Sequence, residues 1–162
     1  MKYDPDTIIN LLIEHEGLEL NVYPDSLGID TIGVGRNLED RGITDDELSY
    51  MGFNSIEAIH LHGITESNAR FLLNNDIRTV ELELECAHPV IQGIKAVRQM
   101  VLVDMGFNLG VPRLNMFKNM WECVENADYG CASAEMLDSK WARQVGRRAE
   151  RLARMMKTGV FH

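Results

Sequence analysis

Residues 14–35 read EHEGLELNVYPDSLGIDTIGVG, and within this stretch the sequence changes from a helical to a strand pattern. Residues 5–16 space their apolar side chains as one face of a helix does, and Gly17 suits the end of such a helix. Further on, β-branched and aromatic residues predict strands at about residues 20–23 and 31–35, separated by a turn that contains proline and glycine. We therefore expect a helix followed directly by a hairpin.

Helices are predicted for most of the remaining chain. A short third strand is possible near residues 36–38, and residues 39–64 show mixed signals with a helix start at residue 44. Thr65 is the expected N-cap of the clearest helix, which runs to about residue 86. Four more helices are expected at about residues 93–107, 113–126, 132–141 and 146–156. Because strand signals are confined to one segment, the predicted fold class is α+β and mainly helical.

The charges are distributed unevenly along the chain. The formal net charge is -9, with 18 acidic and 5 basic residues in residues 1–85 but 7 acidic and 11 basic residues in residues 86–162. This balance argues against a nucleic-acid-binding protein, for which a basic surface is expected. An acidic lobe facing a mildly basic lobe is compatible with a cleft between them.

Cysteine and histidine usage predicts neither a disulfide framework nor a metal site. The three cysteines, Cys86, Cys123 and Cys131, are an odd number and form no C-x-x-C pair. We therefore expect reduced cysteines that serve packing. His60 and His62 lack a cluster of further ligands in the sequence, so no metal is expected there.

The N-terminus lacks the basic and apolar regions of a signal peptide. No apolar run approaches the roughly 20 residues that a membrane-spanning helix needs. The chain is therefore expected to be made in a cytoplasm and to have no stable insertion in a membrane.

Three polar side chains of the opening stretch follow one another at a specific spacing. Glu16 stands at the expected helix end, Asp25 in the turn and Thr31 at the start of the second strand. This Glu-x8-Asp-x5-Thr pattern, continued as Thr-Ile-Gly-Val-Gly, resembles the signature of the phage-type lysozymes, glycoside hydrolase family 24. Cleavage of a glycosidic bond needs one protonated and one ionised carboxyl group. Glu16, in an apolar frame with Leu12 and Leu20, is expected to keep its proton, and Asp25 to be ionised.

The resemblance extends over nearly the whole chain in the same order. The matching segments are residues 63–65, 96–98, 104–110, 139–144 and 147–151, followed by Thr158, Gly159 and Phe161. The resemblance implies a two-lobed lysozyme fold within a single domain. Residues 12–63 would form an N-terminal lobe with the small sheet, residues 65–86 an interlobe helix, and residues 90–162 a helical C-terminal lobe on which helix 5–16 packs.

The resemblance also implies the reaction. A monomer without a cofactor would hydrolyse the β-1,4 bond between N-acetylmuramic acid and N-acetylglucosamine in peptidoglycan. Glu16 would donate a proton, Asp25 would orient or activate water, and Thr31 would help to hold that water. The implied outcome is inversion, for which two carboxyl groups about 6.5–9.5 Å apart are expected.

Further residues match binding or supporting positions of the family. Phe107, Asn108 and Gln144 match sugar contacts, although Phe107 is equally well explained as a core residue. Arg148 matches the arginine that pairs with the catalytic acid, although a solvated helix face also explains it. His15 stands where an acidic residue occurs in a well-known relative, and it either modulates the acid or only completes the helix end.

Two other activities fit the same sequence. A lytic transglycosylase would use a similar fold without consuming water, and a wall-binding module would bind peptidoglycan without cutting it. Residues 140–157 hold seven basic residues, which form either a solvated face or a surface for wall or membrane anions. The preferred setting is host-cell lysis, in which the enzyme is released to the periplasm. A tail-associated or prophage-derived lysozyme is the alternative.

Overall fold

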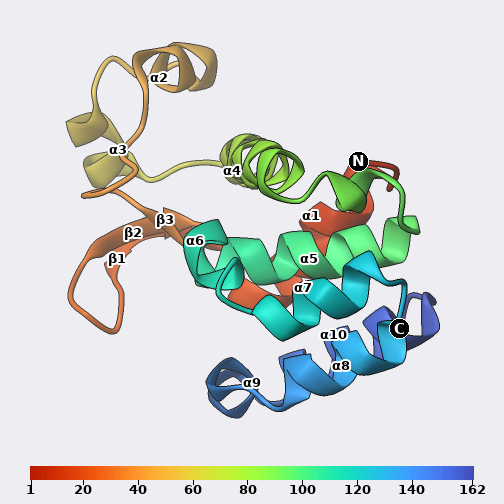
Figure 1. Cartoon of the computed structure of the whole chain (residues 1–162). Helices are drawn as coiled ribbons and strands as arrows, with labels where there is room; N and C mark the ends of the chain where they lie inside the picture. Colours follow the sequence, from red (N-terminus) through yellow and green to blue (C-terminus); the bar gives the residue numbers. More distant parts are fainter. The chain divides into compact units, whose positions relative to one another are not determined.

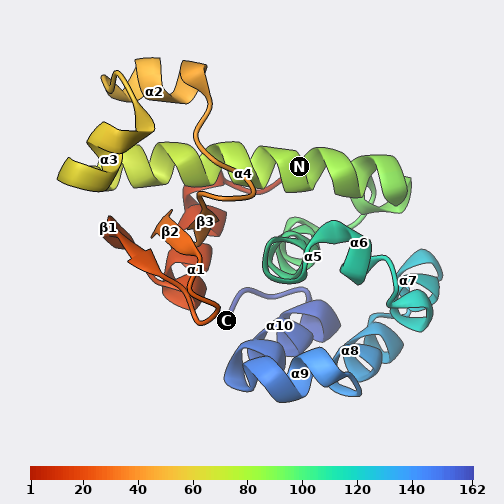
Figure 2. The same ribbon diagram turned by 90° about the vertical axis from the view of Figure 1, so that its left-hand side faces the viewer.

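The computed structural model describes residues 1–162 and contains ten α-helices, one 3-10 helix and a three-stranded sheet. This composition confirms the predicted class, α+β and mainly helical. The residues form two compact units, Pro5–Asp76 and a second one made of Met1–Asp4 with Ile77–His162. The chain passes from the first unit to the second within the long helix α4, Glu66–Ala87 (Figure 2). The predicted packing of the first helix on a C-terminal lobe stays a prediction.

The unit Pro5–Asp76 begins with the predicted helix and hairpin. Helix α1 (Pro5–Glu16) is followed by strands β1 (Glu19–Pro24), β2 (Asp30–Gly33) and β3 (Arg36–Asn37). The strands form an antiparallel sheet in the order β1-β2-β3, drawn in orange in Figure 1. The possible third strand is thus confirmed.

Two short helices occupy the segment whose signals were mixed. They are α2 (Asp45–Met51) and α3 (Ile56–His62). Thr44 caps α2 through a capping box with Glu47, and Ser55 caps α3. Apolar side chains of the sheet, α3 and α4 close over a common core that comprises Ile32, Leu38, Ile59, Ile64, Ala69 and Leu72.

The second unit is built around α5 (Ala96–Leu109), whose residues from Arg98 to Gly106 are all buried. Helix α10 (Arg147–Thr158) packs on α5 and on α8 (Tyr129–Leu137), and α8 packs on α7 (Lys118–Glu125) (Figure 1). Shorter elements connect them, namely η1 (Pro89–Gln92), α6 (Val111–Leu114) and α9 (Lys140–Val145).

Two of the predicted helices of this unit have different bounds. The single helix expected at 113–126 is broken, because the chain turns between α6 and α7 and Trp121 donates its indole N–H to the Leu114 carbonyl across the break, at 3.0 Å. The helix expected at 132–141 begins earlier, where Asp128 accepts the Cys131 N–H, and a new helix begins after Ser139. Side-chain caps at both starts set these boundaries.

The expectation of three reduced cysteines was wrong. Cys123 in α7 and Cys131 in α8 form a disulfide, with their Cα atoms 5.7 Å apart. The turn between the two packed helices brings together cysteines that are eight positions apart, a spacing that lies outside the C-x-x-C pattern. Cys86 is exposed and carries a free thiol.

Two further features concern ligands and membranes. No group of three or more His, Cys, Asp or Glu side chains is arranged to hold a metal ion, and His60 instead contacts Asp30 and the Ile56 carbonyl. None of the helices combines the length and the apolar character that crossing a membrane requires.

Candidate active site

Glu16 is the last residue of α1, directly before the turn into the sheet. Gly17 has φ +80°, a conformation that glycine adopts readily, and its N–H closes the helix on the Ile13 carbonyl at 2.9 Å. The Glu16 side chain is half-buried. Of its expected apolar frame, Leu12 is fully buried one turn earlier, but Leu20 is exposed, so the expectation for Leu20 was wrong.

Asp25 lies just past β1 and is held by the backbone of its own turn. Its Oδ1 accepts the N–H groups of Leu27 at 2.8 Å and Ile29 at 2.9 Å. Such a side-chain turn is a structural role that aspartate often takes. The two bonds fix Oδ1 and do not involve Oδ2. Asp25 can therefore hold the turn through Oδ1 and still present Oδ2 to a water molecule.

Thr31 lies on β2, and its side chain is buried. Its hydroxyl donates to the Ile29 carbonyl at 2.9 Å, which fixes the rotamer and keeps the oxygen lone pairs as acceptors. In the register of the sheet, Thr31 is the partner of Tyr23. The hairpin therefore presents Asp25 and Thr31 from neighbouring strand ends.

The phenol of Tyr23 links the two acidic groups of the motif electrostatically. Partial burial raises the pKa of Tyr23, and the negative charges of Glu19, Asp25 and Glu16 raise it further. Both Glu16 and Asp25 thus act on the same phenol. The structure brings the helix end and the hairpin turn into one acidic environment around Tyr23.

In the second unit, Phe107 and Asn108 lie in the last turn of α5, and both are half-buried. The Asn108 side-chain oxygen accepts the indole N–H of Trp141 at 2.9 Å. Trp141 is buried and lies edge-on to Phe117, with ring centroids 6.5 Å apart. Asn108 is therefore oriented by an aromatic residue of α9.

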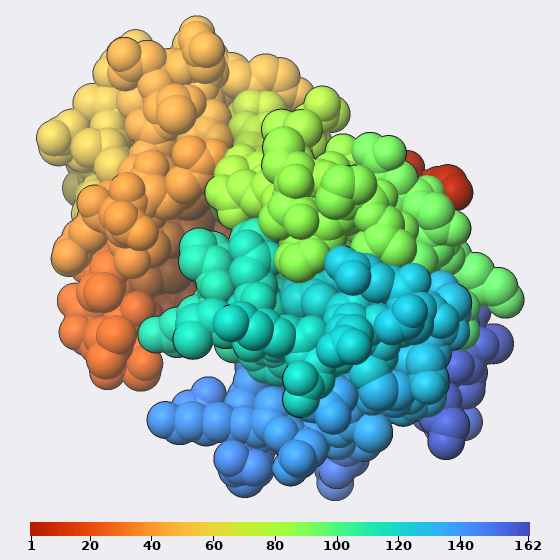
Figure 3. Space-filling view, viewed as in Figure 1, coloured from red at the N-terminus to blue at the C-terminus, as the bar shows by residue number.

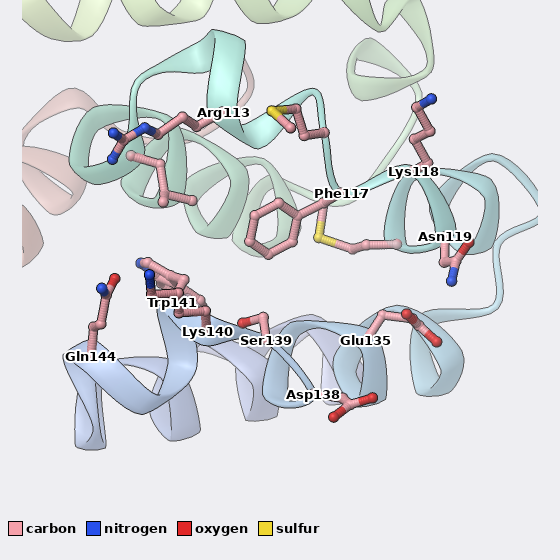
Figure 4. A pocket seen from close by; sticks show the side chains of 13 residues that line it. Arg113, Phe117, Lys118, Asn119, Glu135, Asp138, Ser139, Lys140, Trp141 and Gln144 are labelled. Carbon is pink, nitrogen blue, oxygen red and sulfur yellow. The ribbon is translucent and has the colours of Figure 1, made fainter.

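A groove of about 570 Å³ runs beside this pair within the second unit. Figure 3 shows a hollow between the teal segment of α6 and α7 and the blue segment of α9. Gln144, Trp141 and Ser139 line one wall, and Phe117 and Arg113 lie across from them in Figure 4. Gln144, a predicted sugar contact, is exposed at this groove, whereas Phe107 and Asn108 are not among its lining residues.

The two predicted supporting residues lie in different units. Arg148 in α10 donates its Nε–H to Asp104 of α5 at 2.9 Å, and Asp104 is completely buried. The pairing shows that Arg148 does not lie on a solvated helix face. His15 is half-buried in the last turn of α1.

The sequence reasoning missed Tyr23, Trp141 and Asp104. The sequence contains a local signal for Tyr23: side chains alternate along a strand, so Tyr23 is expected on the same face as Asp25, two residues later. Asp104 and Trp141 have no such local signal. Asp104 bonds to Arg148, 44 positions away, and Trp141 bonds to Asn108, 33 positions away.

The mainly helical α+β fold, in which a helix-end glutamate precedes a hairpin with a fixed aspartate and a buried threonine, is consistent with the lysozyme fold. Comparison with known families narrows the class: the chain belongs to the phage lysozyme family, whose profile matches residues 13–157. Membership of this family implies a glycoside hydrolase that acts on peptidoglycan.

Individual relatives differ in how much of their length the chain covers. It is 28% identical over 160 residues to the pre-baseplate central spike protein Gp5 of Enterobacteria phage T4, covering 94% of this chain but only 28% of that protein. It is 24% and 23% identical to the probable T4-type lysozymes 1 and 2 of Dictyostelium discoideum, covering 96% and 94% of their lengths.

Proposed function

We propose that the protein hydrolyses the β-1,4 bond between N-acetylmuramic acid and N-acetylglucosamine in bacterial peptidoglycan. The observation that carries the proposal is the hairpin, which holds a carboxylate fixed by two backbone N–H groups and a buried hydroxyl, and which follows the glutamate that ends α1 in the chain. This arrangement supports a reaction in which water is held for attack.

In the proposed reaction, Glu16 gives its proton to the oxygen of the scissile bond, and the bond from that oxygen to the sugar carbon breaks. Water attacks the same carbon from the opposite face, and Asp25 takes a proton from it while Thr31 helps to hold it. The configuration at the carbon is inverted. The hydrolase thus forms a free reducing end and consumes one water per bond.

Phe107, Asn108 and Gln144 are proposed to bind the sugar chain, and Arg148 and His15 stay proposed supporting residues. The bond between Asn108 and Trp141 supports a binding role for Asn108, because a fixed amide loses little entropy when it binds a sugar. We propose that the enzyme acts as a monomer without a cofactor.

Analysis of muropeptides released from purified cell wall tests the proposal. Free reducing ends are expected with the natural chain, and Glu16→Gln should abolish their release while the circular dichroism spectrum stays unchanged. Glu39→Gln, at an exposed glutamate of a turn, is the matched control and should retain full activity. The anomeric form of the first product, followed by NMR, tests inversion.

The rival activities give different products in the same experiment. Anhydromuramic ends would show a lytic transglycosylase. Tight binding to the wall with no released ends would show a wall-binding module.

For the setting we propose host-cell lysis, with synthesis in the host cytoplasm and action in the periplasm after release. The similarity to a central spike protein favours a second setting, in which the lysozyme is part of a phage particle. Mass spectrometry of purified particles and of the cleared lysate distinguishes them, since a particle-bound enzyme sediments with the particles.

A further inference from the structure

The hairpin that carries Asp25 and Thr31 presents a third polar side chain, Tyr23, on the same face. Tyr23 and Thr31 are register partners in the antiparallel pair β1-β2, and partners project to the same side of a sheet. The ladder continues past β1, since the Asp25 N–H donates to the Ile29 carbonyl at 2.9 Å. Residues two apart on an extended chain share a face, so Tyr23 and Asp25 do as well.

The hydrogen bonds of Asp25 and Thr31 leave these two groups with acceptors only. Asp25 accepts two backbone N–H groups at Oδ1 and, once ionised, has no proton to donate. The Thr31 hydroxyl already donates its proton to the Ile29 carbonyl. A water molecule between Asp25 and Thr31 would donate one hydrogen bond to each of them. The oxygen of this water would then have no hydrogen-bond donor.

Tyr23 can supply that donor. Its side chain is half-buried, and burial together with the charges of Glu19, Asp25 and Glu16 raises the pKa of the phenol. The hydroxyl therefore keeps its proton throughout the range in which a lysozyme acts. The three carboxyl groups whose charges reach it also place the phenol within the acidic environment of the catalytic motif.

We propose that the Tyr23 hydroxyl donates a hydrogen bond to the attacking water and positions it together with Asp25 and Thr31. The inference rests on the proposed hydrolase function. One lone pair of the water accepts from Tyr23, and the other faces the sugar carbon. The phenol keeps its proton during the reaction, since the proton that the water loses goes to Asp25.

Tyr23→Phe tests the inference, because it removes the hydroxyl and keeps the ring. We expect kcat on purified glycan strands to fall about tenfold, the effect of one lost hydrogen bond of about 1.4 kcal/mol in the transition state, with KM unchanged. The acid limb of the pH profile of kcat should move to higher pH, because ionised Asp25 loses a nearby dipole. A purely structural role of the ring would not move this limb.

Tyr50→Phe is the matched control. Tyr50 is 72% exposed on α2 and stacks on Phe71, so the same chemical change there should leave kcat and the pH profile as they are. Site-specific incorporation of a ring-fluorinated tyrosine at position 23 gives a second measurement that keeps the shape and the donor. Since its hydroxyl still donates, kcat and the pH profile should stay close to those of the natural chain, in contrast to Tyr23→Phe.

The possible outcomes separate a failure of the inference about Tyr23 from a failure of the proposed hydrolase function. An active natural chain with unchanged kcat and pH profile in Tyr23→Phe overturns the inference but not the hydrolase function. A raised KM with unchanged kcat also overturns it, since the phenol then contacts the sugar instead of the water. An inactive, folded natural chain overturns the proposed function and this inference together.

Discussion

At the residue scale, Gly63 controls the junction between α3 and α4. Its backbone has φ +70° and ψ -165°, and the next N–H, that of Ile64, bonds to the Leu20 carbonyl at 2.8 Å. A Cβ atom at this position would overlap the Leu20 carbonyl oxygen and lie 2.7 Å from Oδ1 of Asn21. Both the conformation and the space at Gly63 therefore require glycine.

Gly63→Ala should lower the free energy of unfolding by about 3 kcal/mol, because strain and overlap add. The control is Gly52→Ala, at a helix end with φ +80° but no atom within 4 Å of the added Cβ. It should cost about 1 kcal/mol, the backbone penalty alone. Urea unfolding of both variants measures the difference, and equal losses would contradict the steric argument.

Some residues of the candidate site could be predicted from the sequence, and others could not. The resemblance to the phage-type lysozymes selected Glu16, Asp25 and Thr31, and the structure places them at a helix end and on the hairpin that follows it. Their relative positions depend on local structure, so the spacing in the sequence reflects them. Asp104 and Trp141 were missed because only the packing of α5 against α9 and α10 gives them partners.

At the scale of elements, one buried charge network joins β3, α2 and the first part of α4. Arg36 is 3% exposed and forms ion pairs with Glu47 at 3.0 Å and Asp76 at 2.9 Å. Burial alone would raise the pKa of Glu47, but hydrogen bonds from Arg36, the Thr44 backbone and Asn75 outweigh it and lower this pKa to about 2. The carboxylate is thus more stable in the folded chain than in the unfolded one.

The pH dependence follows from this depressed pKa. The contribution of Glu47 to stability is fully present above its unfolded value of 4.5 and is lost as the pH falls toward about 2. The loss is roughly 3 kcal/mol over this window. Glu47→Gln should be less stable than the natural chain at pH 7, and the gap should narrow between pH 4.5 and 2 in denaturant titrations. Parallel pH profiles would rule out this role of the network.

The spacing of apolar residues did not predict where the helices α6, α7 and α8 begin and end. The apolar spacing of residues 113–126 is helical throughout, yet the chain breaks between α6 and α7 because Trp121 and Leu114 bond across the turn. Helix α8 starts directly after Asp128, which caps it, and therefore begins three residues before the predicted start at residue 132. Strand positions were better predicted because glycines and a proline bound them.

The disulfide between α7 and α8 gives a prediction about this helix pair. It closes a loop of eight positions, so its loss should cost about 2–3 kcal/mol through the entropy of the unfolded chain. Thiol labelling of the folded, oxidised protein should modify Cys86 alone. A reductant should lower the unfolding temperature of the natural chain and leave that of the double variant Cys123→Ser, Cys131→Ser unchanged. Labelling of all three cysteines without reductant would contradict the bond.

At the scale of the whole molecule, the two compact units carry opposite charge. Pro5–Asp76 holds 14 acidic and 3 basic residues, whereas Met1–Asp4 with Ile77–His162 holds 11 acidic and 13 basic residues. Much of the basic excess lies on α9 and α10, where Arg143, Arg147, Arg154 and Lys157 are exposed. Because the net charge is -9, the molecule as a whole is repelled by an anionic polymer while one unit is attracted.

Salt should therefore raise the rate of wall digestion before it lowers it. At low ionic strength the Debye length is about 30 Å, so an anionic wall experiences the negative charge of the whole molecule, and association is slow. At about 0.15 M salt the length falls to about 8 Å, long-range repulsion is screened, and contacts of the basic unit at short range persist. Turbidity clearing of purified wall from low to high salt measures the effect, with a short uncharged glycan as the control substrate. A steady fall in rate from the lowest salt onward would mean that the basic helices, not the net charge, govern the approach to the wall.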